Sequence, residues 1–286
     1  MELLQPHRAA GSGEPPRAQS LTVGGEGGRG PRPRCREWPG TLWAPRRRFD
    51  AATPEWLDRP GLEERLVREE LLQLERFNER TGGCRLVVEA VARLVRARGL
   101  TQASVLDLGT GRADVPRALV AWGRAQGVAL RVTGVDVNPA VLRAAREACP
   151  EAGWPEIRIE QHNMLSLPQP PGSHDFVICS LALHHFANAD ALAILKRVGE
   201  IARVGWLVND LRRSWLSIAL VEAVTRLVVR SPMFAEDARQ SIRSAFSLAE
   251  FRELVRLAGL EGPGSRIFRR HFIFRMTLEG LKKSKP

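Results

Sequence analysis

The sequence of 286 residues contains no tyrosine and only four cysteines. The lack of tyrosine excludes enzymes that depend on a Tyr-Lys proton relay. The cysteines lie far apart and form no Cys-x-x-Cys pair, so a zinc site or a disulfide framework is not expected. No apolar run opens the chain, so we expect no secretory signal and a cytoplasmic protein with reduced thiols. The four cysteines are Cys35, Cys84, Cys149 and Cys179.

Long hydrophobic runs are also missing. The most apolar stretch, Trp215 to Val229, has 15 residues and contains Glu222 and Arg226. It is too short and too charged to span a bilayer. We expect either a buried helix or a lid over an apolar acceptor, with peripheral membrane contact as an alternative.

Basic residues outnumber acidic ones by 43 to 32, for a formal net charge of +11. A basic excess can serve nucleic acids, anionic membranes or acidic ligands. Here the charges are spread along the chain, without a Lys/Arg block or an aromatic-rich RNA-binding motif. We therefore interpret them as a basic surface and expect no nucleic-acid partner.

Two segments precede the region that carries the motifs. Residues 1–50 hold seven prolines and eight glycines without apolar periodicity, which predicts a disordered tail. Between Leu62 and Val95 apolar residues recur at helical spacing, interrupted at Asn78 and at Thr81-Gly82-Gly83. Residues 51–100 are therefore predicted to form a cap of two helices.

From residue 101 short apolar strands alternate with helices, which is typical of a parallel sheet covered on both faces. A helical insertion is predicted at about 211–246, with a mobile flap over 230–243. Ser247 and Glu250 form a capping box that begins a further helix. The predicted strands span 104–108, 130–135, 157–161, 176–180, 204–208, 265–269 and 272–278. The other predicted helices span 115–124, 139–148, 190–198 and 216–229.

The segment VLDLGTGRAD, residues 105–114, joins a buried strand to a helix through an Asp-x-Gly-x-Gly sequence. Gly109 and Gly111 let the backbone approach a ligand at the carboxyl end of the strand. Asp114 stands where dinucleotide-binding loops need a third glycine, and its carboxylate would repel a diphosphate. Asp114 would instead attract the positive methionine end of S-adenosylmethionine (SAM), and Asp107 can bind the SAM amino group.

A second apolar strand ends in Asp136, 25 residues after Gly111. An acid at this place can accept both ribose hydroxyls, and we assign Asp136 and the adjacent Val137 to the cofactor site. The spacing fits NAD equally well. The alternative is that Asp136 only caps the helix that begins at Pro139.

Together these motifs resemble those of the class I, Rossmann-like SAM-dependent methyltransferases over roughly residues 100–280. The segment Ser180-Leu181-Ala182-Leu183-His184-His185-Phe186 is most similar to the small-molecule branch that includes quinone C-methyltransferases. The resemblance implies an α/β fold with a seven-stranded, mostly parallel sheet and an antiparallel last strand. It also implies SAM as the cofactor and a SAM-dependent methyltransferase domain over residues 101–286.

The resemblance also assigns residues beyond the second strand. Asn163 takes the place of the family's acidic residue at the adenine, and its amide carbonyl can still accept a hydrogen bond. Met164 would pack on the adenine, and Ser180 would end the fourth strand beside the cofactor. Arg112-Ala113 replaces the family's usual glycine after Gly111, which is a departure from the pattern.

His184 and His185 follow the fourth strand, where the methyl group and the acceptor meet in this fold. Either histidine can remove a proton from a phenol or enol, or the pair can simply shape the loop. Asn209 and Asp210 after the fifth strand can line the acceptor pocket. Arg212 and Arg213 are expected at the surface, with binding of an acidic substrate as the alternative.

The sequence thus predicts methyl transfer from SAM to an O or C nucleophile of a small aromatic, quinone-like or polyketide-like molecule. Two other functions stay open. One is an NAD(P)-dependent oxidoreductase, which Asp114 and the missing tyrosine argue against. The other is a non-catalytic protein that binds SAM.

Overall fold

The computed structural model describes residues 42–59, 61–261, 265–271 and 274–282. The predicted tail lies outside the described residues up to residue 41. Within the described residues, no helix is long and apolar enough to cross a membrane.

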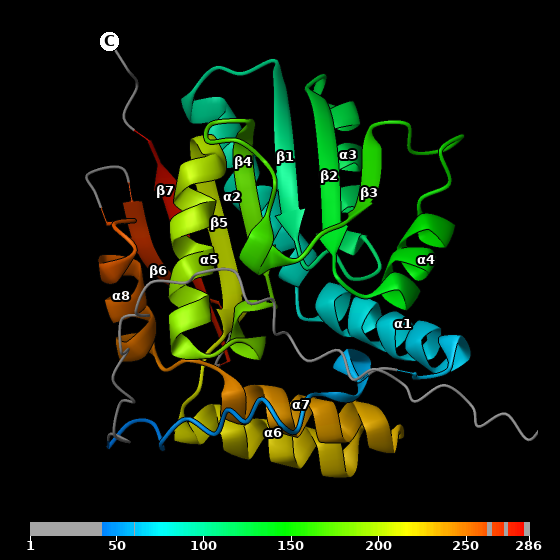
Figure 1. Cartoon of the computed structure of the whole chain (residues 1–286), viewed down its shortest axis with the longest axis vertical. Helices are drawn as coiled ribbons and strands as arrows, with labels where there is room; N and C mark the ends of the chain where they lie inside the picture. The colour runs from blue at the N-terminus through cyan, green and yellow to red at the C-terminus, as the bar shows by residue number, and fades with distance from the viewer. Residues whose placement is uncertain (1–41, 60, 262–264, 272–273, 283–286) are drawn as a thin grey trace, which may run out of the picture. The chain divides into compact units, whose positions relative to one another are not determined.

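The strands form one sheet in the order β3-β2-β1-β4-β5-β7-β6 (Figure 1). Strands β1 to β5 run parallel, and β7 pairs antiparallel with both β5 and β6. The prediction of a mostly parallel sheet with an antiparallel last strand is confirmed. The strands are β1 (Gln102–Leu108), β2 (Ala129–Asp136), β3 (Ile157–Gln161), β4 (His174–Ser180), β5 (Ala202–Leu211), β6 (Ser265–His271) and β7 (Arg275–Leu281).

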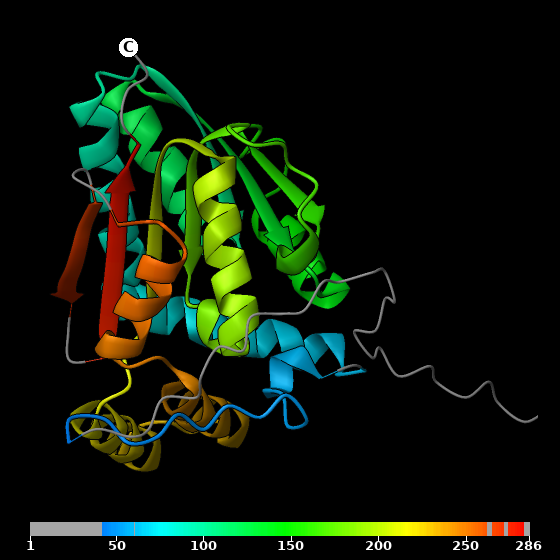
Figure 2. The same cartoon turned by 60° about the vertical axis from the view of Figure 1, so that its left-hand side comes forward.

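Helices cover both faces of the sheet (Figures 1 and 2). α2 (Gly83–Ala97) and α3 (Asp114–Gln126) pack on one face, where their apolar side chains meet Val105, Val132 and Ile178. α5 (Asn188–Ile201) and α8 (Leu248–Leu257) pack on the other face. Each face of the sheet thus has its own hydrophobic core. Because strand residues alternate between the two faces, the same strands contribute side chains to both cores.

Most of the remaining helices lie at the carboxyl ends of the parallel strands (Figure 1), whereas α4 packs against β2 and β3. α1 contacts both α4 and α7, and α6 packs on α7. Two short helical turns belong to the same edge: η2 follows β3 and η3 follows β4. The bounds are η1 (Trp56–Asp58), α1 (Glu64–Arg80), α4 (Pro139–Ala148), η2 (Met164–Ser166), η3 (Leu183–His185), α6 (Trp215–Leu227) and α7 (Pro232–Ser244).

The predicted flap over residues 230–243 is wrong, because this segment forms helix α7. Ser231 caps the helix through its side chain, and Pro232 occupies the first turn, where a missing N–H does no harm. Phe234, Ala235 and Ile242 are buried. The apolar residues of this helix form a narrow face and are separated in sequence by charged residues. Apolar periodicity therefore did not predict the helix.

The predicted boundary of the tail at residue 50 is also wrong, because residues 42–50 pack on the domain. Ala44 is buried. The Arg47 guanidinium donates hydrogen bonds to the backbone oxygens of Phe186 (2.8 Å) and His184 (3.1 Å) and to Asn188 Oδ1 (2.9 Å). The segment therefore crosses the loop that follows β4.

Arg213 corrects a further prediction. Its side chain is buried rather than at the surface, and its guanidinium lies 2.6 Å from Glu250 Oε1. It also donates to the backbone oxygens of Pro45 and Ala245. Arg213 thereby joins the N-terminal segment, α7 and α8. Neighbouring Arg212 is partly buried and also departs from the expected surface position.

Candidate cofactor and acceptor site

The loop between β1 and α3 turns sharply at two glycines. Gly109 and Gly111 have φ angles of 70° and 53°, in the left-handed region that favours glycine. The N–H groups of Gly109 and Thr110 donate to Val135 O at 2.9 and 3.0 Å, which ties the loop to β2. A Cβ at position 109 would lie 2.9 Å from the Ala182 Cβ, so the loop closely approaches the segment after β4.

Ala113 is the position where the sequence departs from the family's pattern. It has a φ of 59°, so a residue with a side chain adopts the left-handed conformation there. This conformation costs a residue other than glycine about 1–2 kcal/mol. The loop therefore holds a left-handed turn at Ala113 at an energetic cost.

Two carboxylates end the neighbouring strands β1 and β2. Asp107 is buried, and burial raises the pKa of its carboxyl group to about 7. Burial also raises the pKa of Asp136, although the N–H of Asn138, 3.0 Å from Asp136 Oδ1, favours its charged form. A cation or hydrogen-bond donor brought to this edge would stabilise both carboxylates.

Asp114 joins the cofactor loop to the helical cap. Its Oδ2 accepts hydrogen bonds from Asn78 Nδ2 at 2.6 Å and from Cys84 Sγ at 3.1 Å. Asn78 Oδ1 in turn accepts from Arg275 Nη2 at 3.1 Å. Arg275 is fully buried, and its Nη1 has no hydrogen-bond partner among the described residues. No motif or periodicity marked Arg275 as a candidate site residue.

Residues after β3 and β4 border the same loop. Asn163 Oδ1 accepts from the Leu165 N–H at 2.9 Å and so caps η2, which leaves a second lone pair on that oxygen. The Met164 Cε lies 3.4 Å from the place of a Cβ at position 109. Ser180 Oγ accepts from Asn209 Nδ2 at 2.9 Å. Val137, at 58% exposure, lies open at the end of β2.

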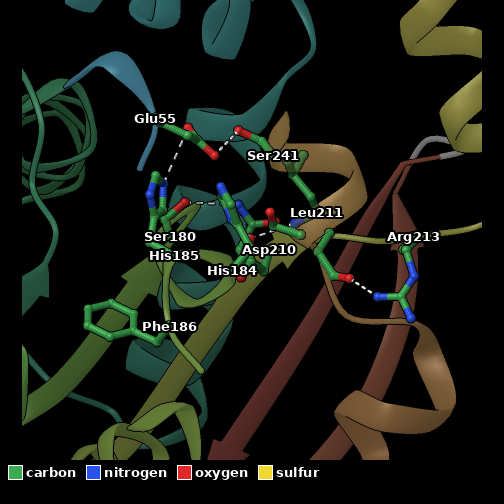
Figure 3. Close-up of polar contacts among 12 residues, drawn as sticks. Glu55, Ser180, His184, His185, Phe186, Asp210, Leu211, Arg213 and Ser241 are labelled. Atoms are coloured by element: carbon green, nitrogen blue, oxygen red, sulfur yellow. Dashed lines mark hydrogen bonds and ion pairs between the residues drawn. The ribbon is translucent and has the colours of Figure 1, made fainter. Parts of the chain in front are cut away.

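The histidine pair lies in η3, the helical turn that follows β4 (Figure 3). The ring centroids of His184 and His185 are 4.3 Å apart. His184 is buried, and its Nδ1 lies 2.6 Å from Asp210 Oδ1. His185 Nδ1 lies 2.7 Å from Asp58 Oδ2. Each ring is thus oriented by a carboxylate at Nδ1.

Glu55 completes this group. Its Oε2 lies 3.9 Å from His185 Nε2, and its Oε1 accepts a hydrogen bond from Ser241 Oγ at 2.6 Å (Figure 3). Burial alone would lower the pKa of His185, but Glu55 and Asp58 outweigh it and raise that pKa to about 10. His185 is therefore an imidazolium at neutral pH. Glu55 precedes η1 and Asp58 is its last residue, ahead of α1, where no periodicity or motif marked them.

Comparisons with known proteins agree with this geometry. A family described as "Methyltransferase domain" matches residues 105–205, which run from β1 into β5. An uncharacterized methyltransferase of Bacillus licheniformis is 31% identical over 97 residues, which cover 34% of this chain. The chain spans about two fifths of the length of that relative, 41%. Residues 105–205 are therefore similar in sequence to methyltransferase domains.

Two solved structures share the fold. The plantazolicin methyltransferase BpumL, in complex with a substrate analogue and S-adenosylhomocysteine (SAH), superposes with a TM-score of 0.58 at 12% identity. That match covers 75% of this chain and 90% of BpumL. The magnesium protoporphyrin IX methyltransferase of Synechocystis PCC 6803, with bound SAH, has a TM-score of 0.52 at 18% identity. It covers 71% of this chain and 85% of the enzyme.

Proposed function

We propose that this chain, whose residues 105–205 are similar in sequence to methyltransferase domains, transfers the methyl group of SAM to an O or C nucleophile of a small acceptor. The observation that carries the proposal is the pair of carboxylates at the Gly109–Gly111 turn, the buried Asp107 and the partly buried Asp136. A diphosphate cofactor would meet negative charge here, whereas the cationic SAM would meet complementary charge.

The proposed cofactor pose follows the strand ends. Asp136 accepts the ribose hydroxyls, and Asp107 accepts the methionine ammonium group. Asn163 and Met164 border the adenine, because η2 packs beside the loop at Gly109. Ser180 and Val137 complete the rim. Asp114 is held by Asn78 and Cys84, so it positions the loop and adds negative charge near the ammonium.

In the transfer, the bond between the sulfonium sulfur and the methyl carbon breaks as the acceptor nucleophile forms a bond to that carbon. The sulfonium becomes a thioether, and the acceptor loses a proton. Much of the acceleration comes from holding nucleophile, methyl and sulfur in line. His184, oriented by Asp210, can take the acceptor proton, whereas His185 already carries one.

The resemblance of residues 180–186 to quinone-type enzymes supports a small aromatic, quinone-like or polyketide-like acceptor. The two solved relatives are named for a plantazolicin and a magnesium protoporphyrin substrate, which agrees with a small-molecule acceptor. Apolar side chains on α6, such as those of Trp215 and Leu216, are exposed. They support a peripheral membrane contact through which an apolar acceptor could arrive.

The test is a pair of calorimetric titrations of the purified chain, with SAH and with NADH. We expect SAH to bind and NADH not to bind. Tight NADH binding without SAH binding would refute the proposal. Transfer of an isotope-labelled methyl group from SAM to a panel of phenols and quinols then tests turnover. SAH binding without transfer to any acceptor would favour a non-catalytic SAM-binding protein.

A further inference from the structure

Glu55 is distant in sequence from the adjacent His184 and His185, but the three side chains meet at one place (Figure 3). One potential ligand atom from each residue lies within 4.8 Å of those of the other two. Bonds of about 2.0–2.1 Å to a tetrahedral ion would place such atoms roughly 3.3–3.5 Å apart. Small side-chain rotations would therefore close the three atoms around an ion.

The hydrogen bonds around the histidines have the form found at metal sites. Each Nδ1 lies against an aspartate, Asp210 for His184 and Asp58 for His185. This leaves Nε2 as the remaining nitrogen of each ring. Metal-bound histidines usually donate their other N–H to a carboxylate, which fixes the ring and raises its basicity. Here both rings have that partner.

A hydrogen bond also orients Glu55, the third potential ligand. Ser241 Oγ donates to Glu55 Oε1, and Oε2 is the oxygen that faces His185. His184 is almost fully buried at 3% side-chain exposure, whereas His185 is 26% exposed, which provides a path of entry. Three carboxylates, from Glu55, Asp58 and Asp210, surround two imidazoles. The group therefore has negative charge for a cation to balance.

We propose that His184 Nε2, a Glu55 carboxylate oxygen and His185 Nε2, which releases its proton to solvent on binding, hold a divalent transition-metal ion such as Zn²⁺. Two nitrogens and one oxygen match the ligand preference of zinc, whereas Mg²⁺ and Ca²⁺ prefer oxygen alone. Three protein ligands leave a fourth position for an exchangeable molecule, as in catalytic zinc sites.

The role of the ion rests on the proposed methyl transfer. The fourth position lies in the acceptor half of the site, so an acceptor hydroxyl or enol oxygen can bind there. The metal would lower the pKa of that oxygen, so that it would lose its proton to water and become the nucleophile without a protein base. In the metal-bound protein His184 thus holds the ion rather than a proton. The acceptor class narrows to molecules with an ionisable oxygen at or beside the methylated position.

The test measures metal binding directly on the full chain. The protein is stripped with a chelator, dialysed, and titrated with Zn²⁺ and separately with Mg²⁺ by calorimetry. We expect one Zn²⁺ per chain and no Mg²⁺ binding. Co²⁺ added in place of Zn²⁺ should give the visible absorption of a low-coordinate site with nitrogen ligands.

Three variants identify the ligands and one serves as control. His185→Gln and Glu55→Gln should weaken Zn²⁺ binding at least about 100-fold, and Asp58→Asn about 10–100-fold through the lost orientation of His185. The control residue, His174, lies at the start of β4, at the end of the strand away from the proposed site. The His174→Gln variant should bind Zn²⁺ like the unaltered chain.

SAH affinity is measured for every variant, because it reports folding and the cofactor site without the metal. We expect it to stay unchanged. Unchanged Zn²⁺ binding in His185→Gln and Glu55→Gln, or no stoichiometric Zn²⁺ in the unaltered chain, would overturn the metal site. If SAH fails to bind while Zn²⁺ binds as expected, the methyltransferase proposal fails and the metal site stands.

Discussion

At the scale of single residues, Asp107 and Asp136 occupy similar places near the ends of their strands but differ in burial. Asp107 is enclosed, with 2% exposure, and its pKa is raised to about 7. Asp136 is only partly buried and accepts a backbone N–H. The two carboxylates should therefore respond differently to the cofactor.

Replacing Asp136 with alanine should remove the ribose contact. The loss should weaken SAH binding by on the order of 1.5–3 kcal/mol, the range for hydrogen bonds to charged groups. Calorimetry checks the affinity, and Glu151→Ala, at an exposed loop position, is the control. An unchanged affinity in Asp136→Ala would mean that the ribose lies elsewhere.

SAM binding should release a proton from Asp107 near pH 6.5. Burial keeps this carboxyl largely protonated below its pKa of about 7. A bound ammonium group favours the charged form and lowers that pKa, so roughly half a proton or more should leave. Calorimetry in two buffers of different ionisation enthalpy measures the release. Asp107→Asn should abolish it, and a buffer-independent enthalpy for the unaltered chain would contradict the assignment.

Single residues were predictable where a motif fixes their place. The turn at Gly109 and Gly111 and the acids at both strand ends follow from local sequence. Arg213 was misplaced because a charged side chain is expected at the surface, and its partner Glu250 is 37 residues away. Glu55 and Asp58 reach His185 only through tertiary packing, which local patterns do not contain.

At the scale of elements, strong periodicity gave accurate bounds. The helix predicted over 139–148 and the strand over 157–161 match α4 and β3 at both ends. The capping box at Ser247 and Glu250 is present at the start of α8. Helix α7 was not predicted because its few apolar residues form only a narrow face, which is a weak periodic signal in the sequence.

The Arg213–Glu250 pair is a buried ion pair that connects the chain after β5 to α8. Arg213→Ala should destabilise the protein by about 3–5 kcal/mol, because it leaves the buried Glu250 charge without its partner. Urea unfolding measures the loss. Arg256→Ala, which breaks an exposed pair with Glu253, should cost less than about 1 kcal/mol.

A double variant separates charge from packing. Arg213→Met combined with Glu250→Met removes both buried charges and should recover much of the stability lost in Arg213→Ala. The loss of the Glu250 capping contact should still cost about 1 kcal/mol. A double variant less stable than Arg213→Ala would show that the pair itself is net stabilising.

At the scale of the whole molecule, the site depends on chain segments far apart in sequence. Residues 42–50 cross the loop after β4, η1 supplies Asp58, and α7 supplies Ser241. A parallel sheet covered by helices on both faces could be predicted from the alternation of strands and helices. The placement of the cap, α6 and α7 over that edge could not, because it depends on buried polar contacts.

Arg47 is the main anchor of the N-terminal segment. Arg47→Ala should lower stability by on the order of 2 kcal/mol, since backbone oxygens of Phe186 and His184 lose a charged donor. Thermal unfolding measures this, with Arg65→Ala in an exposed helical pair as control. Equal melting temperatures for the two variants would contradict an anchoring role.

The first residue of α2 has a consequence for how this sequence can diverge. A Cβ at Gly83 would lie 1.7 Å from Asn78 Oδ1 and 2.8 Å from Arg275 Nη1. Any larger residue at position 83 must move Asn78 and break its bond to Asp114. Positions 78 and 83 should therefore covary among related sequences, and a relative without this glycine must fasten its cap to the cofactor loop by other residues.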